Sequence, residues 1–330
     1  MEGRVIQSTG KWYKVDTKNG IVESRLPGKF RLIKKEVTNP VAVGDIVDIR
    51  IEEDGTGSIT EIQDRKNYIP RKATHGRRGE QILASNIDRA WVVQSVKRPE
   101  LNTGFIDRFL VTCEAYELHG GIIINKADLA SDRDRGYLND LALDYFNLGY
   151  PTVIISADKE INLEKLIGEL RNNTSVFIGP SGVGKTSILN KVEPGANFKV
   201  GEISSYSDKG KHTTTYARLV PLHFGGYIVD TPGVREFGLV QIEKSELSLY
   251  FPEMIEPRRF CRFNNCTHFH EPGCGVIAAY EEGDIPQAAI TPISIFWNRW
   301  PFSEHPANYR QDPFPHPVEH RARMHFPSDL

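Results

Sequence analysis

The chain has 330 residues, 39% of them hydrophobic and 25% charged, a composition ordinary for a globular protein with a sizeable core. This length predicts two or three domains. The formal net charge is −2, so any nucleic-acid-binding surface has to be local. No apolar run approaches membrane-spanning length, and the first residues, MEGRVIQSTG, lack the apolar region of a signal peptide. We therefore expect a cytoplasmic protein without a membrane segment, and a monomer.

Residues 1–75 are rich in short runs typical of β-strands. These runs alternate polar and apolar residues or carry β-branched side chains, and Gly, Asn and Asp turn signals separate them. They cover residues 3–8, 11–16, 20–25 and 45–51. About five short strands in a segment of this size predict a closed barrel, for which the OB-fold is the commonest form.

The same region has a weak RNA-binding pattern. Residues 65–78, RKNYIPRKATHGRR, contain six Lys or Arg and no acidic residue. Aromatic rings stack on bases, and basic groups meet phosphates. The candidates are Trp12, Tyr13, Phe30 and Tyr68 for stacking, and Arg31, Lys34 and Lys35 for phosphates. The competing interpretation is a core of aromatic side chains beside a solvated linker.

Residues 76–245 alternate between strand-like and helix-like runs. The strand-like runs are 90–96, 121–124, 152–155, 176–178 and 227–230, and the helix-like runs are 105–116, 134–148 and 162–172. This alternation predicts an α/β domain with a mainly parallel sheet. Because ligands bind such sheets at the carboxyl ends of the strands, we expect the polar motifs to gather there.

The segment GPSGVGKTS at residues 179–187 matches the phosphate-binding loop G-x-x-x-x-G-K-[ST], between a strand-like and a helix-like run. Glycines let backbone N–H groups approach phosphates, and the helix dipole adds positive potential. Lys185 is predicted to reach the β- and γ-phosphates, and the Thr186 hydroxyl to bind Mg²⁺. The predicted nucleotide contacts are Gly179, Pro180, Ser181, Gly182, Val183, Gly184, Lys185, Thr186 and Ser187.

A guanine-reading motif, N-K-x-D, follows an earlier strand-like run. The Asp128 carboxylate can accept from N1–H and from the exocyclic amine of guanine, and adenine would leave it unpaired. Asn125 is predicted to brace the loop and the base, and the stem of Lys126 to cover the ring. Ser156 and Ala157 follow the next strand-like run, where a backbone N–H would meet the guanine carbonyl.

Two later segments are suited to be nucleotide switches. In DTPG, Asp230 would hold Mg²⁺ through a water, and the Gly233 N–H would sense the γ-phosphate. The polar stretch GKHTTT at residues 210–215 supplies Thr214, which we predict to complete the Mg²⁺ shell. Ordering of such a segment, and its release on hydrolysis, is the usual GTPase switch.

The order of these motifs is unusual. The guanine loops come first, then the phosphate loop, then the switches, which is a circular permutation of the order in a small GTPase. The second switch therefore leads directly into the C-terminal region. Val234 stands where Ras-like enzymes place a water-orienting Gln, which predicts slow hydrolysis until a partner or another residue completes the site. His212 is the internal catalytic candidate, and a plain loop histidine is the alternative.

A cluster of Cys and His lies in residues 246–286, with the spacing C-x4-C-x-H-x5-C. Three thiolates and one imidazole within such a short loop suit tetrahedral Zn²⁺ in a closed, structural site. The predicted ligands are Cys261, Cys266, His268 and Cys274. His270 competes with His268, and unligated thiols are the alternative. After these residues, the Pro- and His-rich segment 287–330 shows no helical period and is predicted to be extended or disordered.

Together these motifs resemble one family, the circularly permuted GTPases that depend on the small ribosomal subunit (RsgA). The resemblance covers about residues 3–286 and adds NPVAVGD at 39–45 to the motifs above. It implies an N-terminal OB-fold β-barrel at 1–75, a circularly permuted α/β P-loop GTPase domain at 76–245 and a C-terminal zinc-binding helical domain at 246–286. A charged helix ends the family's chains, and residues 287–330 do not match it.

The resemblance also implies a function. The family hydrolyses GTP under stimulation by the small (30S) ribosomal subunit and acts in late subunit maturation through ribosomal RNA contacts. GTP or GDP, Mg²⁺ and one structural Zn²⁺ are the implied ligands. In this family the second-switch Gln is also replaced by a hydrophobic residue, and the switch histidine is thought to help hydrolysis, as expected here of Val234 and His212.

Three functions compete. The first is an enzyme whose GTP cycle times its binding to a small-subunit precursor. The second is an RNA-binding module in which the nucleotide is structural, and the missing Gln favours it. The third, an ATP-dependent enzyme, is opposed by Asp128. Lys185, Thr186 and Asp230 favour the first function, because a static ligand does not need a sensing switch.

Overall fold

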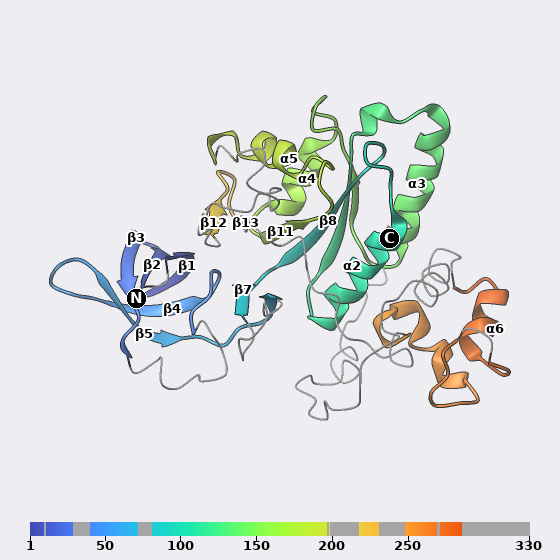
Figure 1. Ribbon diagram of the computed structural model, residues 1–330, viewed down its shortest axis with the longest axis horizontal. Helices are drawn as coiled ribbons and strands as arrows, with labels where there is room; N and C mark the ends of the chain where they lie inside the picture. The colour runs from blue at the N-terminus through green and yellow to red at the C-terminus, as the bar shows by residue number, and fades with distance from the viewer. Residues whose placement is uncertain are drawn as a thin grey trace, which may run out of the picture. The chain divides into compact units, whose positions relative to one another are not determined.

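A computed structural model describes residues 1–9, 11–28, 40–71, 81–196, 198, 218–230, 248–268 and 271–285 (Figure 1). The chain divides into two compact units, Met1–Val240 and Gln241–Leu330. In the described part of the chain, no helix is long and apolar enough to cross a membrane.

The described residues at the start of the first unit form a barrel of five strands. Its strands are β1 (Glu2–Ser8), β2 (Trp12–Thr17), β3 (Gly20–Arg25), β4 (Ile46–Ile51) and β5 (Gly57–Ile62). They pair in the order β1-β2-β3-β5-β4, and a β1–β4 pairing closes the ring. Alternate side chains point inward, as strand geometry requires, and Val5, Val15 and Ile59 are fully buried in the barrel core. The predicted barrel is therefore confirmed.

One candidate for RNA stacking belongs to this core. Tyr13 is only 5% exposed and packs with Val15 and Ile49, so its ring has no face for a base and the prediction is wrong. Its neighbour Trp12 points the other way, because successive side chains of a strand alternate between faces. Trp12 is 37% exposed, and the guanidinium of Arg25 lies 4.7 Å from its ring centroid.

A buried carboxylate ties the barrel to the next segment. Asp45 accepts hydrogen bonds from Arg65 Nε at 2.7 Å, from Ser85 Oγ at 2.6 Å and from the Ala42 N–H at 2.8 Å. Ser85 ends a hairpin of β6 (Tyr68–Arg71) and β7 (Gln81–Ser85). Arg65, the first residue of the predicted basic run, is thus part of a structural ion pair and is not a phosphate contact.

The rest of the first unit is a layered α/β domain. Its strands are β8 (Arg89–Ser95), β9 (Gly120–Asn125), β10 (Thr152–Ile154), β11 (Thr174–Ile178), β12 (Arg218–Pro221) and β13 (Tyr227–Asp230). The sheet order is β10-β9-β8-β11-β13-β12, parallel except for the antiparallel β12. The predicted, mainly parallel sheet is confirmed.

Within the described residues, four helices cover the two faces of this sheet. They are α2 (Thr103–Ala115), α3 (Asp132–Asn147), α4 (Leu163–Leu170) and α5 (Lys185–Val192). Helices α2 and α3 pack on one face through residues such as Phe109 and Leu141, and α4 and α5 pack on the other through residues such as Leu166 and Ile188 (Figure 1). Two short 3₁₀ helices, Ala127–Leu129 and Pro194–Ala196, follow β9 and α5.

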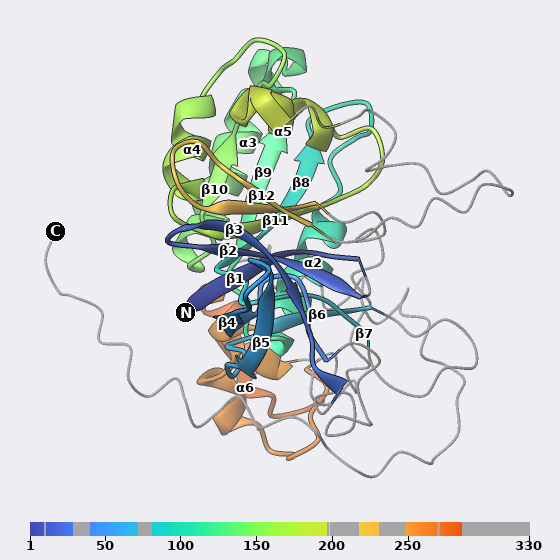
Figure 2. The same ribbon diagram turned by 90° about the vertical axis from the view of Figure 1, so that its left-hand side faces the viewer.

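The barrel and the α/β domain share one sheet. Strand β12 pairs with β13 on one side and with β1 of the barrel on the other, where Gln7 is opposite Arg218 (Figure 2). Two side-chain bonds support the junction: Arg4 Nη1 donates to Thr174 Oγ1 at 2.6 Å, and Tyr227 OH donates to Asp16 Oδ2 at 2.7 Å. The amino-terminal strand β1 is therefore held against strand β12 of the α/β domain.

In the second unit, the described residues form short helical segments joined by turns. They include the 3₁₀ helices Pro252–Met254 and Pro257–Phe260 and the helix α6 (Gly275–Glu281). Gly275 is required where α6 begins, because a Cβ there would lie 2.3 Å from the carbonyl oxygen of Pro257. The tail predicted at 287–330 lies outside the described residues.

Candidate nucleotide and metal sites

The predicted nucleotide motifs meet at one edge of the sheet. Strands β9, β10, β11 and β13 run parallel in one sheet, with β8 between β9 and β11, so their carboxyl ends lie at the same edge. They lead into residues 125–128, 156–157, 179–184 and Asp230, respectively. The topology thus brings the sequence motifs together, although Asn125 and Asp230 are 105 positions apart in the chain.

The phosphate loop is shaped by glycines that no other residue can replace without movement. A Cβ on Gly179 would lie 2.2 Å from the Val93 carbonyl oxygen, and one on Gly184 would lie 2.3 Å from Asn125 Nδ2. Gly182 and Gly184 have φ angles of 84° and 96°, in the left-handed region that side chains disfavour. The backbone is therefore held close to its neighbours, which is the shape a phosphate cradle needs.

Lys185 opens helix α5 beneath this loop. Its Nζ donates to the carbonyl oxygens of Gly179 at 2.7 Å and Pro180 at 2.8 Å, and the residue is only 7% exposed. A buried ammonium needs such partners, because desolvation without them is costly. The bonds hold the charge within the loop, where the sequence predicts the β- and γ-phosphates.

Asn125 joins the guanine-reading half to the phosphate loop. It is 2% exposed; its Nδ2 donates to the Val183 carbonyl at 2.9 Å, and its Oδ1 accepts from the Ala157 N–H at 3.0 Å. One amide thus uses both its ends to hold two loops together. In this structure the Ala157 N–H, expected to meet the guanine carbonyl, is engaged by Asn125.

Lys126 lies across the phosphate loop rather than free above it. Its Nζ donates to the Gly182 carbonyl at 2.7 Å and to the Arg98 carbonyl. Burial lowers the pKa of Lys126, and the nearby Arg98 charge lowers it further. The loop after β8, which holds Arg98, therefore belongs to the site. Sequence reasoning missed it, although its place after a buried strand was the available signal.

Asp128 is oriented by the neighbouring loop. Ser156 Oγ donates to Asp128 Oδ1 at 2.5 Å and accepts from the Lys159 N–H at 3.1 Å. Ser156 is fully buried, so its hydroxyl is fixed and presents the carboxylate of Asp128 in one orientation. This is the arrangement that recognition of two adjacent N–H donors on one base edge requires.

The carboxyl end of β13 carries an ion pair that the sequence did not predict. Arg218 Nε and Nη2 each lie 2.7 Å from Asp230 Oδ2, and the two residues are register partners on β12 and β13. Asp230 is the predicted magnesium-side carboxylate. The remaining switch predictions, His212, Thr214, Gly233 and Val234, lie outside the described residues.

The four predicted zinc ligands come together in the second unit. One ligand atom from each of Cys261, Cys266, His268 and Cys274 lies within 4.8 Å of all the others. His268 Nδ1 lies 3.5 Å from Cys261 Sγ and 3.3 Å from Cys274 Sγ, and its Nε2 lies 3.0 Å from Ser248 Oγ. The Nδ1 atom therefore faces the sulfurs, while Ser248 fixes the ring.

The chemistry of this cluster fits a bound cation. Burial raises the pKa of Cys266 to about 12 and raises that of Cys274, and burial lowers the pKa of His268. Three thiols packed with one imidazole are stable as thiolates only beside a positive charge. His270, the competing ligand, lies outside the described residues.

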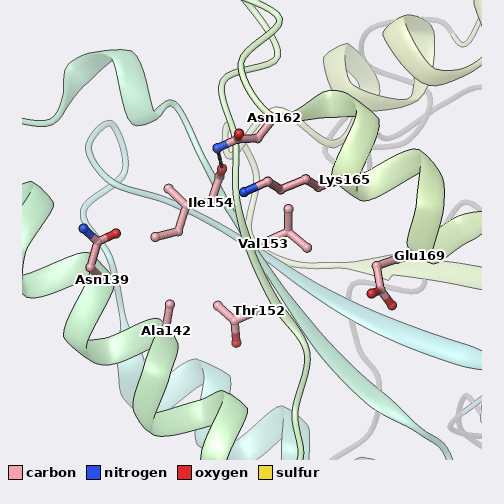
Figure 3. A pocket seen from close by; sticks show the side chains of 8 residues that line it. All are labelled: Asn139, Ala142, Thr152, Val153, Ile154, Asn162, Lys165 and Glu169. Atoms are coloured by element: carbon pink, nitrogen blue, oxygen red, sulfur yellow. Dashed lines mark hydrogen bonds between the residues drawn. The ribbon is translucent and has the colours of Figure 1, made fainter. Parts of the chain in front are cut away.

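A groove of about 510 Å³ lies elsewhere, along the edge strand β10 (Figure 3). Asn139 and Ala142 of α3 face Lys165 and Glu169 of α4 across Thr152 and Ile154, and Asn162 Nδ2 donates to the Ile154 carbonyl at 2.9 Å. None of its lining residues is a predicted nucleotide contact. The groove is therefore separate from the nucleotide-binding edge.

Strand β9 leads into the guanine loop and comes earlier in the chain than β11, which leads into the phosphate loop, yet both strands end at the same edge of the sheet. This order of loops is that of a circularly permuted GTPase. Residues 62–240 match the RsgA GTPase family, and residues 2–59 match the RsgA N-terminal domain. The chain belongs to the RsgA GTPase family. The predictions of its fold class and of GTP hydrolysis are confirmed.

Known proteins share this likeness over nearly the whole chain. A small ribosomal subunit biogenesis GTPase RsgA of Bacteroides fragilis is 44% identical over 292 residues, which are 88% of this chain and 94% of that protein. The crystal structure of YjeQ from Thermotoga maritima matches with a TM-score of 0.74 and 34% identity, over 90% of this chain and 97% of that one. The structure of YloQ, a circularly permuted GTPase, matches with a TM-score of 0.70 and 28% identity, over 90% and 93%.

Proposed function

We propose that this GTPase acts in maturation of the small ribosomal subunit, where its hydrolysis of GTP is slow alone and is stimulated by that subunit. The family and the names of its relatives support this role. GTP-dependent binding and release on ribosomal RNA would then time one late step, in the cytoplasm and as a monomer. The structural observation that supports the nucleotide site in this proposal is the brace of Asn125 between the guanine loop and the phosphate loop.

The residues divide into three tasks. The phosphate loop 179–187 holds the phosphates, with the Lys185 ammonium on the β- and γ-phosphates. Asp128 and the loop of Ser156 and Ala157 select guanine. The hydroxyls of Thr186 and Thr214 would bind Mg²⁺, and the carboxylate of Asp230 would hold the ion through a water. The ion would supply positive charge beside the phosphates.

Hydrolysis needs one more group, because valine cannot orient a water. We assign this task to His212, whose imidazole would hold the attacking water, and we assign detection of the γ-phosphate to the Gly233 N–H. The small subunit would place the first switch so that His212 reaches the water. Contacts from a partner can raise GTPase turnover by about 10³–10⁵-fold.

The domains would share the work on the ribosome. We propose that residues 1–75 and 246–286 meet ribosomal RNA and that residues 76–245 carry the GTPase site, with 287–330 as an atypical tail. Exposed Trp12 beside Arg25 offers one stacking surface on the barrel. One structural Zn²⁺ on Cys261, Cys266, His268 and Cys274 would hold the second unit together.

The experiment that tests the proposal is GTP turnover by the pure protein, alone and with isolated small ribosomal subunits, with large subunits as the control. We expect strong stimulation by the small subunit only, and loss of that stimulation in His212→Ala with GTP binding intact. Equal turnover with either subunit would refute the ribosomal role. A His212→Ala protein with full stimulated turnover would remove His212 from the mechanism.

The alternative is an RNA-binding module in which the nucleotide is structural. The missing water-orienting Gln supports this alternative. Tight GTP binding without turnover under any condition, together with retained binding to small subunits, would decide for it.

A further inference from the structure

Arg218 makes the closest contact to the predicted magnesium-side carboxylate. Its Nε and Nη2 atoms both lie 2.7 Å from the same oxygen, Asp230 Oδ2. The Asp230 side chain is 14% exposed and that of Arg218 is 46% exposed, so the pair sits at the surface of the site with the carboxylate inside. Within the described part of the chain, Asp230 Oδ1 accepts no hydrogen bond.

The place of Asp230 connects this pair to the phosphate loop. Asp230 is the last residue of β13, whose register with β11 pairs Val229 with Val176. Strand β11 ends two residues further on, at Ile178, and the loop that holds Lys185 follows. The carboxylate therefore stands at the same edge as the phosphate loop, where a metal on the phosphates would be.

We infer that Arg218 is a positioning residue for magnesium: it holds Asp230 by one oxygen and leaves the other to accept from a metal-bound water. This inference rests on the proposed function of the nucleotide site. Two charge-assisted bonds to one oxygen fix the rotamer of the carboxylate, so less conformational freedom is lost when the hydrated ion arrives.

Arg218 is itself fixed from both sides. On one side it is the register partner of Asp230, and on the other it is the register partner of Gln7 in barrel strand β1. Strand β12 begins at Arg218, so the guanidinium projects from the point where the sheet becomes continuous. A side chain anchored in this way can define the direction of the carboxylate better than one on a loop.

Arginine suits this task better than lysine. Its planar guanidinium presents adjacent N–H groups that can meet one oxygen together, whereas an ammonium is a point charge on a flexible stem. Arg218→Lys should therefore keep the positive charge but lose part of the orientation. A purely electrostatic role would predict no difference between the two residues.

The test is the rate at which a fluorescent GDP analogue dissociates from the full chain, measured from EDTA to millimolar Mg²⁺. In wild type we expect Mg²⁺ to slow release. We expect Arg218→Ala to raise the Mg²⁺ concentration of half-effect about fivefold, as befits a partly exposed ion pair, with Arg218→Lys in between. Release in EDTA should not change, because no metal is then positioned.

The matched control is Arg135→Ala. Arg135 also has an exposed guanidinium near a carboxylate, with Nη1 3.7 Å from Asp132 Oδ1, but it lies on helix α3. It should leave the Mg²⁺ dependence unchanged. Thermal melting of each variant checks the fold, and Arg218→Lys alone decides the question if Arg218→Ala unfolds.

Three results would overturn the inference. The first is an unchanged or lowered Mg²⁺ requirement in Arg218→Ala and Arg218→Lys, which would mean that Arg218 is neutral or competes with the ion. The second is nucleotide release that is faster in EDTA by the same factor as in Mg²⁺, which would mean a structural role only. The third is a release rate of the wild type that does not depend on Mg²⁺. If wild type does not retain guanine nucleotide at all, the proposed nucleotide site fails as well. If the wild type retains guanine nucleotide and the Arg218 variants release it with the same Mg²⁺ dependence as the wild type, the proposed nucleotide site stands and only the role of Arg218 is overturned.

Discussion

The nucleotide-binding edge and the Cys/His cluster achieve order in opposite ways. The first is assembled from loops spread over residues 125–230, and protein groups such as Asn125 hold those loops to one another. The second is made from fourteen residues, 261–274, between two short helical turns. Its side chains are three thiols and an imidazole, and burial raises the pKa of Cys266 and Cys274, so these thiols stay protonated unless a cation is bound beside them.

The difference predicts which site depends on its ligand. A site braced by internal hydrogen bonds on a packed sheet keeps its shape, because the brace does not involve the ligand. A cluster of metal ligands in a unit with few elements gains much of its folding free energy from the metal. We therefore expect loss of a brace to weaken binding, and loss of a metal ligand to unfold a unit.

The largest effect should come from Cys274→Ser. The binding free energy of structural zinc in zinc-finger peptides is about 10–16 kcal/mol. The variant keeps only three of the four predicted ligands, so zinc binding should become too weak to keep the second unit folded. We expect zinc content near zero and protease cleavage within residues 241–285, with guanine nucleotide affinity changed less than about threefold because the first unit has its own core. Cys113→Ala, which removes a buried thiol from α2, should leave the zinc content unchanged.

The opposite result would break the comparison. If Cys274→Ser retained one tightly bound zinc and wild-type resistance to protease, the second unit would be held by packing alone. His270 would then be the first residue to examine as a substitute ligand.

The next effect in size concerns base selection. Asp128→Asn should move the preference from GTP towards xanthosine triphosphate, because an amide presents both a donor and an acceptor to the base edge. Sites built on such hydrogen bonds discriminate by about 10⁴-fold, and a change of that order in the affinity ratio is expected. An unchanged preference, measured by competition for a fluorescent nucleotide, would remove Asp128 from base reading.

Asn125→Ala should have a smaller but still large effect. It leaves the Val183 carbonyl and the Ala157 N–H without their partner. Each buried group left unpaired costs about 1–3 kcal/mol, so affinity for GDP should fall by at least about 30-fold. Asn139→Ala on α3, in the groove away from the site, is the matched control and should bind normally. Normal GDP affinity in Asn125→Ala would show that the loops do not need the brace.

The smallest effect should come from Ser156→Ala. It removes one hydrogen bond to the carboxylate of Asp128. Because such a bond contributes only a modest free energy, we expect guanine nucleotide affinity to fall about tenfold and the base preference to stay the same. Ser58→Ala on barrel strand β5 serves as control. A shift in base preference, rather than in affinity, would mean that Ser156 itself contacts the base.

Sequence reasoning found the elements that local patterns encode. The alternation of residues in 20–25 and 227–230 predicts β3 and β13 with their observed bounds, and the motif spacings predict the loops at the carboxyl edge. The ligand spacing at 261–274 likewise predicts the cluster that the structure brings together. These features depend on neighbours in the chain, which a single sequence displays.

The features that sequence reasoning missed depend on residues far apart. Tyr13 reads as an exposed aromatic, yet barrel closure turns it inward. Arg65 reads as part of a basic run, yet Asp45 lies twenty residues earlier with its carboxylate buried. Arg98 and Arg218 reach the nucleotide edge because of the fold; the place of Arg98 after a buried strand was a signal for it, and no local pattern marks Arg218.

The pairing of β1 with β12 also has a consequence for how the chain is made. Gln7 leaves the ribosome more than two hundred residues before Arg218, its partner in the sheet. The barrel can close through β1 and β4 early in synthesis, but the carboxyl half of β1 waits with an open edge until β12 emerges. Contacts of such long sequence separation form late and slowly. The junction between the barrel and the nucleotide-binding domain should therefore be the last part of the first unit to mature, and the part most dependent on complete translation.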